Sequence, residues 1–231
     1  MNYTRYSMGR LIAIEGLDGS GKGTQTERLY NRFVENGIKA CTVSFPDYES
    51  PSSALVNMYL KGDFGNQPHD VNGYAASAFF AVDRFASYKT KWKKNYDDGE
   101  IVICNRYTTS NLFHQMVKLP REEWDSFILW LNDFEYKKLG LPAPDAVIYF
   151  DMDPDISQKL LAGRYNGDDS KKDIHEKNVE YIKSCRETAL YAAEKLGWTV
   201  VKCFEGENPL PIETIEETAL KAIKKAFGEI V

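Results

Sequence analysis

The sequence is poor in residues that crosslink a chain or bind metals, with four cysteines and three histidines in 231 residues. The cysteines lie far apart and include no Cys-x-x-Cys pair; they are Cys41, Cys104, Cys185 and Cys203. This spacing argues against a disulfide framework and against a zinc site. Cys41 and Cys104 fall in apolar runs, so we expect both to be buried as small hydrophobic residues.

Long apolar runs and an excess of positive charge are also missing. No stretch approaches the ~18 apolar residues that a membrane-spanning helix needs. Residues 1–10 lack the apolar core of an export signal. The net charge of −5 is unlike that of a protein that coats nucleic acid. We therefore expect a cytoplasmic protein with no membrane or nucleic-acid partner, folded as one domain over residues 1–231.

Short apolar runs alternate with longer amphipathic segments along the chain. The runs expected to be strands are Leu11–Ile14, Ala40–Phe45, Ile101–Cys104, Ala146–Phe150 and Trp198–Cys203. Most are apolar on both faces, which is typical of a parallel sheet covered by helices. The segments expected to be helical include Gln25–Glu35, Asn72–Lys94, Ile174–Leu196 and Pro211–Phe227. This alternation predicts a three-layer α/β domain.

A glycine-rich stretch, Gly16-Leu17-Asp18-Gly19-Ser20-Gly21-Lys22-Gly23-Thr24, follows the first expected strand and opens the first helix. Glycines let the backbone approach phosphate oxygens, and the start of the helix adds the positive end of its dipole. The ammonium of Lys22 is expected to reach the β- and γ-phosphates. The pattern predicts a P-loop fold that binds ATP. The residues expected to bind ATP are Gly16, Gly19, Ser20, Gly21, Lys22, Gly23 and Thr24.

The residue after the loop lysine usually carries a hydroxyl that binds Mg²⁺, but here it is Gly23. The hydroxyl comes one place later, at Thr24, in a version of the loop that resembles adenylate kinases. We expect Mg²⁺ to be held through water and phosphate oxygens. Thr24 is then expected to contact a phosphate, and it is the one candidate for a direct metal ligand.

Three further blocks are placed to bind a second substrate. Phe45-Pro46-Asp47 and Asn105-Arg106-Tyr107 end two expected strands, and Asp83-Arg84 lies in the long helical segment. The carboxyl ends of parallel strands line the ligand crevice of an α/β sheet. Phe45, Arg106 and Asp18 should therefore converge near the glycine-rich loop.

In order and spacing, these blocks resemble the thymidylate kinase family of nucleoside monophosphate kinases. The similar stretches are residues 14–22, Phe45-Pro46-Asp47, residues 79–84, Asn105-Arg106-Tyr107 and Pro142-Ala143-Pro144-Asp145, with Arg164 in a lid-like insert. The resemblance implies a five-stranded parallel sheet wrapped by helices, and a homodimer formed through helices. It also implies that ATP, with Mg²⁺, phosphorylates dTMP to dTDP.

The resemblance implies roles for individual residues as well. Asp18 would accept a hydrogen bond from the acceptor's 3′-hydroxyl, Phe80 would stack on thymine, and Arg84 would bind the base. Residues implied in acceptor binding are Asp18, Phe45, Phe80, Arg84, Arg106 and Tyr107. Residues implied in catalysis are Lys22, Arg106 and Arg164. Several cations around two phosphates are what phosphoryl transfer requires, because it depends on positioning and charge stabilisation.

Two positions depart from the family pattern. Gly19 stands where some members carry an arginine, so we expect the missing charge to come from Arg164, with Lys171 or Lys172. These residues lie in a polar insert at about residues 164–173, expected to be a mobile lid that excludes water. Asn105 stands where the family has an aspartate, which keeps the shape and loses the charge. We expect slower turnover or a higher magnesium requirement.

Most of these residues also have a structural alternative. Arg106 could form a strand-end salt bridge, and Arg84 could pair with an acid on a neighbouring helix. Phe80 could belong to the core, Asp18 could cap the helix, and Arg164 could be a solvated charge at a helix end.

The three histidines differ in the expectations they carry. His69 and His175 lie in polar stretches and are expected to be solvated. His114 follows the Asn105-Arg106-Tyr107 block, and whether it faces the acceptor crevice stays open.

Two other functions also remain open. A deoxynucleoside kinase would phosphorylate a 5′-hydroxyl and would benefit from a carboxylate base, for which Glu15 and Asp47 are candidates. A nucleotide-binding regulator without turnover would lack a second nucleotide pocket.

Overall fold

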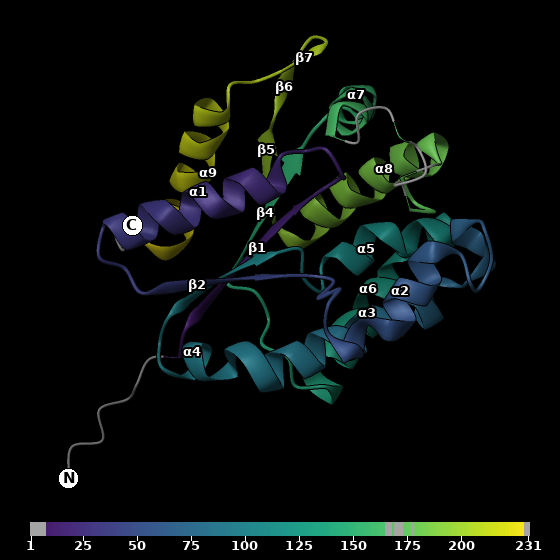
Figure 1. The fold of residues 1–231 in the computed structure, drawn as a ribbon, viewed down its shortest axis with the longest axis horizontal. Coiled ribbons are helices and arrows are strands. Elements are labelled where there is room, and N and C mark those ends of the chain that lie inside the picture. The colour runs from purple at the N-terminus through teal and green to yellow at the C-terminus, as the bar shows by residue number, and fades with distance from the viewer. Residues whose placement is uncertain (1–7, 165–167, 169–172, 177, 229–231) are drawn as a thin grey trace.

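The structure is a computed structural model of the chain, and it describes residues 8–164, 168, 173–176 and 178–228. Five parallel strands form one sheet in the order β2-β3-β1-β4-β5 (Figure 1). They are β1 (Arg10–Gly16), β2 (Ala40–Ser44), β3 (Ile101–Asn105), β4 (Ala146–Asp151) and β5 (Thr199–Lys202). The expected α/β fold with a five-stranded parallel sheet is confirmed.

Helices connect the strands. The α-helices are α1 (Lys22–Glu35), α2 (Ala54–Lys61), α3 (Gly73–Ser87), α4 (Lys93–Asp97), α5 (Ser110–His114), α6 (Trp124–Asn132), α7 (Pro154–Arg164), α8 (Val179–Leu196) and α9 (Ile212–Phe227). Short 3₁₀ turns are η1 (Pro51–Ser53), η2 (Pro68–Asp70), η4 (Met116–Lys118) and η5 (Arg121–Glu123), and wider π-helical turns are η3 (Tyr88–Trp92) and η6 (Asp133–Lys138). A small hairpin pairs β6 (Phe204–Glu205) with β7 (Asn208–Pro209). No helix in these ranges is long and apolar enough to cross a membrane.

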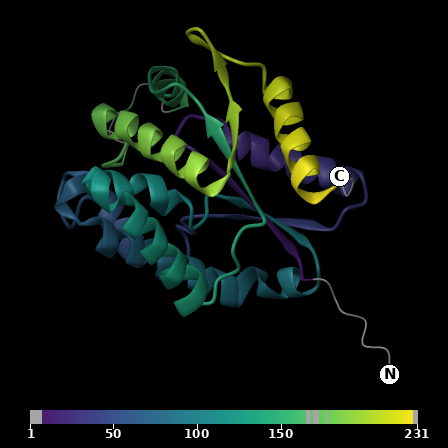
Figure 2. The same ribbon diagram turned by 180° about the vertical axis from the view of Figure 1, so that it is seen from behind.

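The sheet lies between two layers of helices. Helices α1 and α9 cover one face, and α3, α4, α5 and α8 lie on the other (Figures 1 and 2). Alternate side chains of the central strand β1 enter the two cores, because successive residues of a strand point to opposite faces. Ile12 and Ile14 pack in the cluster under α1 and α9, whereas Leu11 and Ala13 pack with Trp92 on the opposite face.

The expectation that Cys41 is buried is wrong, whereas Cys104 is fully buried. Cys41 is only half-buried because β2 is an edge strand, with a neighbour on one side alone. An apolar run in the sequence does not distinguish an edge strand from a central one.

Two expected helices differ from those observed. The segment expected at Asn72–Lys94 starts at its cap as expected, since Asn72 accepts a hydrogen bond from the Ala75 N–H, but it widens into η3 after Ser87. The segment expected at Ile174–Leu196 becomes helical only at Val179. The side chain of Asp173 accepts from the N–H groups of His175 and Glu176, a local turn that competes with helix formation, and Asn178 caps the helix start by accepting from the Tyr181 N–H.

The strand register aligns the carboxyl ends that form the site. Ile14 of β1 pairs with Asn105, the last residue of β3, and Gly16 pairs with Phe150 near the end of β4. The backbone N–H of Arg106 then donates to the Ile14 carbonyl at 2.9 Å. This places Arg106 beside the loop that leaves β1.

Candidate active site

The glycine-rich loop connects β1 to α1 in a conformation that needs glycine. Gly19 and Gly21 have φ values of 82° and 83°, in the left-handed region that other residues rarely adopt. A Cβ on Gly19 would also lie 2.5 Å from the carbonyl oxygen of Ser157. Ser20 Oγ is buried and has no hydrogen-bond partner within the described part of the chain. The loop therefore presents an unused hydroxyl at the start of α1, where phosphate groups are favoured.

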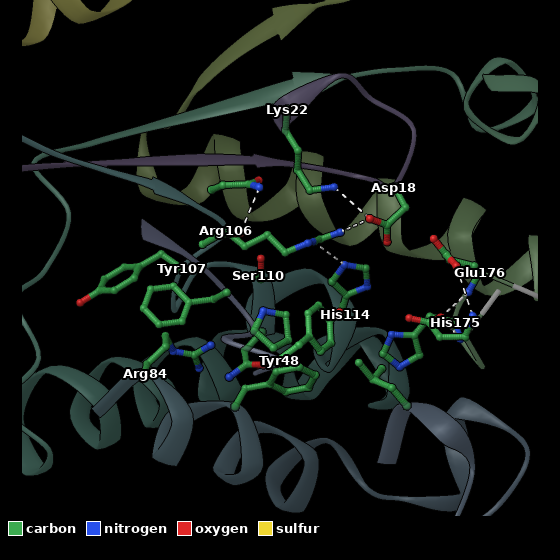
Figure 3. A pocket seen from close by; sticks show the side chains of 18 of the residues that line it. Asp18, Lys22, Tyr48, Arg84, Arg106, Tyr107, Ser110, His114, His175 and Glu176 are labelled. Atoms are coloured by element: carbon green, nitrogen blue, oxygen red, sulfur yellow. Dashed lines mark hydrogen bonds and ion pairs between the residues drawn. The ribbon is translucent and has the colours of Figure 1, made fainter. Parts of the chain in front are cut away.

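Three charged side chains meet at the mouth of this loop (Figure 3). Asp18 Oδ1 accepts hydrogen bonds from Lys22 Nζ at 2.9 Å and from Arg106 Nη2 at 2.7 Å. Burial alone would raise the pKa of Asp18, but the charges of Arg106 and Lys22 outweigh it and hold that pKa well below its usual value. Burial and the charge of Arg106 lower the pKa of Lys22. The site thus concentrates two cations on one carboxylate oxygen.

Arg106 has an unusual backbone for its residue type. Its φ is 68°, and among the described residues it is the only non-glycine with positive φ. Such a conformation is rare for a residue with a long side chain and persists where surrounding structure enforces it. Here the Ile14 carbonyl holds its N–H, and Asp18 and His114 hold its guanidinium.

A cavity of about 680 Å³ opens beside these charges. Its charged end is formed by Asp18, Lys22 and Arg106, and its lining includes Phe45, Pro46, Tyr48, Phe80, Arg84, Tyr107, His114 and His175. The lining mixes aromatic side chains with many polar and charged ones, and the volume is in the usual range of small-molecule sites. The cavity is large enough for a mononucleotide.

The aromatic residues predicted to bind the acceptor all line this cavity. Phe45 is buried and lies 6.0 Å, ring centre to ring centre, from Tyr107. Tyr107 is anchored by its hydroxyl, which donates to the Pro142 carbonyl at 2.9 Å. Phe80 is half-buried and packs edge-on against Tyr59. Its ring is therefore both part of a core cluster and part of the cavity wall.

Asp83 and Arg84 are adjacent on α3, but their side chains bind different partners. Asp83 accepts hydrogen bonds from the Asp47 N–H at 2.9 Å and from the hydroxyls of Ser52 and Ser53 at 2.8 and 2.6 Å. It thereby holds the loop after β2. Arg84 is 2% exposed and forms a two-point ion pair with Glu135, so the alternative partner on a neighbouring helical segment is present. Arg84 nevertheless lines the cavity.

The carboxylates considered as bases for a nucleoside kinase lie outside the cavity lining. Glu15 is fully buried and accepts hydrogen bonds from the Tyr107 N–H at 2.9 Å and from the hydroxyls of Thr109 and Ser110. Asp47 pairs with Lys91. Glu15 therefore fixes the segment after β3, and Asp47 belongs to the loop that Asp83 holds.

The expectation that His175 is solvated is wrong. It is 6% exposed, lines the cavity, and its Nε2 lies 2.7 Å from the Tyr59 hydroxyl. Burial, followed by the charge of Lys118, lowers the pKa of His175 to about 3. Apart from Ile174, its chain neighbours are polar, and its hydrogen-bond partner Tyr59 lies in α2, far away in sequence. His69 is exposed, as expected.

The residues that would face a magnesium ion carry no charge. Asn105 Nδ2 donates to Ser44 Oγ at 3.2 Å, and Asn105 Oδ1 is buried with no hydrogen-bond partner in the described part of the chain. Thr24 is exposed. Within residues 8–164, 168, 173–176 and 178–228, no group of three or more His, Cys, Asp or Glu side chains is placed to hold a metal. A free amide oxygen near the loop fits a magnesium ion held mainly by water and phosphate.

The expected lid falls largely outside the described residues. Arg164 ends α7, but its side chain is outside the description, as are Lys171 and Lys172. At the far end of this segment, Asp173, His175 and Glu176 line the cavity. The described residues 173–176, just before α8, therefore reach the cavity.

Comparisons with known proteins agree on one family. A family model described as thymidylate kinase matches residues 14–208. The chain is 31% identical to a thymidylate kinase of Mycobacterium tuberculosis, covering 79% of this chain and 84% of that one. It is 32% identical to one of Caenorhabditis elegans, covering 67% and 68%. A solved thymidylate kinase structure from Candida albicans shares the fold, with a TM-score of 0.66, 19% identity and coverage of 94% and 92%. The chain belongs to the thymidylate kinase family.

Proposed function

We propose that this protein transfers the γ-phosphoryl group of ATP to the 5′-phosphate of dTMP, giving dTDP and ADP. An oxygen of the acceptor phosphate attacks the γ-phosphorus, and the bond from that phosphorus to the β–γ bridging oxygen breaks. The observation that carries the proposal is the convergence of Lys22 and Arg106 on Asp18, between the glycine-rich loop and the cavity. A donor phosphate site thus abuts a nucleotide-sized acceptor site.

Each side of the site has its own task in this reaction. The loop N–H groups, Ser20 Oγ and Lys22 bind the β- and γ-phosphates of ATP. Arg106 binds the acceptor phosphate, and its planar fork suits two phosphate oxygens at once. Lys22 and Arg106 thereby offset charge as the γ-phosphoryl group moves between them. Arg164, with Lys171 or Lys172, closes over the donor phosphates.

The remaining cavity residues select the acceptor. Phe80 stacks on the thymine ring, while Phe45 and Tyr107 close the apolar wall around it. Glu135 takes the Nε and Nη2 donors of Arg84, so we assign the base contact to Nη1. Asp18 accepts from the sugar 3′-hydroxyl, in exchange for one of its present cationic partners.

Magnesium is the cofactor in this proposal. When bound, Mg²⁺ offsets charge on the transferring phosphates. Asn105 Oδ1 and the Thr24 hydroxyl are the groups of this chain that would help hold it, through water or a phosphate. We expect Asn105→Asp to lower the magnesium concentration needed for half-maximal rate; an unchanged requirement would refute this assignment.

An ADP-release assay across dTMP, dUMP, UMP, dCMP, AMP and thymidine tests the function. We expect dTMP to be used most efficiently. A preference for thymidine would identify a nucleoside kinase, against which the burial of Glu15 already argues. ATP binding by calorimetry without turnover of any acceptor would identify a regulator.

We further propose a cytoplasmic homodimer. All four cysteines are free thiols, which suits a reducing compartment. Helices α2, α3 and α6 lie side by side (Figure 1) and carry exposed apolar side chains. The exposed fractions are 42% for Leu55, 50% for Val82 and 71% for Leu129. A second copy of the chain would remove this apolar surface from water.

A further inference from the structure

We propose that His114 is a positioning residue that holds Arg106 in place as a neutral hydrogen-bond acceptor. The inference rests on the proposed function, in which Arg106 clamps the acceptor phosphate. His114 ends α5, and its side chain lies between the cavity and α8 (Figure 3).

The contact between Arg106 and His114 determines which nitrogen of the His114 ring carries the proton. Arg106 Nη1 lies 3.1 Å from His114 Nε2. A guanidinium has only donors, so Arg106 donates and Nε2 must accept with its lone pair. The proton of the neutral ring is then on Nδ1, which lies 3.6 Å from Cys185 Sγ and donates to it. The geometry therefore requires the Nδ1–H tautomer.

The surroundings of His114 hold the ring in this orientation. It stacks on His175 with ring centres 5.5 Å apart and an angle of 11° between the planes. The Tyr181 hydroxyl of α8 donates to the His114 backbone carbonyl. Thus α8 and the turn that precedes it support a residue that touches Arg106.

The cations that face His114 also favour the neutral ring, and they outweigh the opposing charge of Asp18. The titratable groups that surround it come from the loop, α1, the end of β3, the turn before α8, and α8; they are Asp18, Lys22, Arg106, His175 and Cys185. Burial, followed by the charge of Arg106, lowers the pKa of His114 well below its usual value. A protonated ring would lose its acceptor and face the guanidinium as a like charge.

His114 matters because the other anchor of Arg106 is shared. Asp18 Oδ1 also holds Lys22, and in the proposed reaction Asp18 turns to the sugar hydroxyl of the acceptor. His114 then remains the side chain that fixes the plane of the Arg106 fork. Arg106 needs such an anchor because a freely rotating fork would lose entropy each time it bound phosphate.

Three variants test this role. His114→Leu removes the acceptor, and we expect kcat/KM for dTMP to fall ~10- to 100-fold, the range for losing a hydrogen bond to a charged group. The KM for ATP should change little. His114→Gln places an amide oxygen near the position of Nε2 and should restore most of the loss. His69→Leu makes the same substitution at an exposed histidine and should match the wild type.

A merely structural role gives a different pattern. It would lower the thermal midpoint of His114→Leu, change both KM values together, and leave His114→Gln as impaired as the leucine variant; that pattern overturns the inference. So does wild-type kcat/KM in His114→Leu.

A second measurement needs no enzymatic activity. ¹⁵N NMR of the three histidines distinguishes the tautomers, and we expect a neutral Nδ1–H form for His114 at pH 7. An Nε2–H or imidazolium form overturns the inference. If the wild-type protein does not phosphorylate dTMP, the proposed function fails, and the NMR result still decides whether Arg106 donates to His114.

Discussion

Arg106 combines a strained backbone with a guanidinium held from two sides. Its positive φ, a backbone conformation that few residue types adopt, directs the side chain toward the loop. Asp18 and His114 each take one terminal nitrogen. The side chain is therefore ordered before any phosphate binds. The site fixes the orientation of the planar guanidinium as well as the position of its charge.

Arg106→Lys tests whether the fork is needed. We expect kcat/KM for dTMP to fall by about 10²- to 10³-fold, as when one preorganised donor is lost, with little change in ATP affinity. Steady-state kinetics and calorimetry with ATP measure the two effects. Equal loss of ATP affinity and acceptor turnover would contradict a role on the acceptor side.

His175 should make stability depend on pH. Its folded pKa of about 3 lies below its unfolded value, so the unfolded chain binds a proton that the folded chain does not. This contribution is fully present above pH 6.5 and is lost as pH falls toward 3, by up to ~1.4 kcal/mol per pH unit. We expect His175→Gln to flatten this dependence in urea unfolding between pH 7 and 4. Parallel curves would show that another group is responsible.

The sequence was a good guide to residues near the loop and a poor one to their distant partners. Asp18, Lys22 and Arg106 could be placed together because strand ends of a parallel sheet share one edge. Glu135, the partner of Arg84, lies 51 positions away, and Tyr59, the partner of His175, lies 116 away. No local pattern encodes such pairs, because they depend on how α2 and η6 pack.

At the scale of elements, the loop after β2 is held in place by a residue of another element, α3. It contributes Pro46 and Tyr48 to the cavity, and Asp83 on α3 binds three of its donors. The same loop contains η1 and leads into α2, which supports His175 through Tyr59. One buried carboxylate thereby orders a whole side of the cavity.

Asp83→Asn tests this control. The amide keeps one acceptor oxygen and replaces the other with a donor, so the Asp47 N–H or the two serine hydroxyls lose their acceptor. We expect the free energy of unfolding to fall by about 1–3 kcal/mol. The KM for dTMP should rise more than the KM for ATP. Urea unfolding and kinetics measure both. Asp125→Asn, at an exposed aspartate of α6, is the control, and a similar loss there would contradict a specific role for Asp83.

At the scale of the molecule, the sequence predicted the order and type of the helices and strands, but it predicted less accurately where each one begins and ends. Apolar runs bounded by turn residues predicted all five strands of the sheet. The start of α8 was misplaced because Asp173 holds a short turn and Asn178 caps the helix only at Val179, and hydrophobic periodicity reports neither. Exposed apolar residues on α2, α3 and α6 became visible only once the helices were placed.

Leu129→Glu tests the proposed dimer. A charge at a buried position of the interface would oppose association, so we expect a shift from dimer to monomer in analytical ultracentrifugation. Val34→Glu on α1 is the matched control, because that side chain is also exposed but lies on the other face of the sheet. A wild-type protein that sediments as a monomer would refute the dimer.

The carboxylate shared by Lys22 and Arg106 has a consequence for how ions compete with substrate. Without nucleotide, Lys22 and Arg106 are both paired with Asp18, so part of their charge is already offset before an anion arrives. A small monovalent ion such as chloride replaces one such bond poorly, whereas a nucleotide brings several phosphate oxygens together with a sugar hydroxyl that re-occupies Asp18. The resting site should therefore bind small salt ions weakly and favour ligands that replace both of these contacts at once.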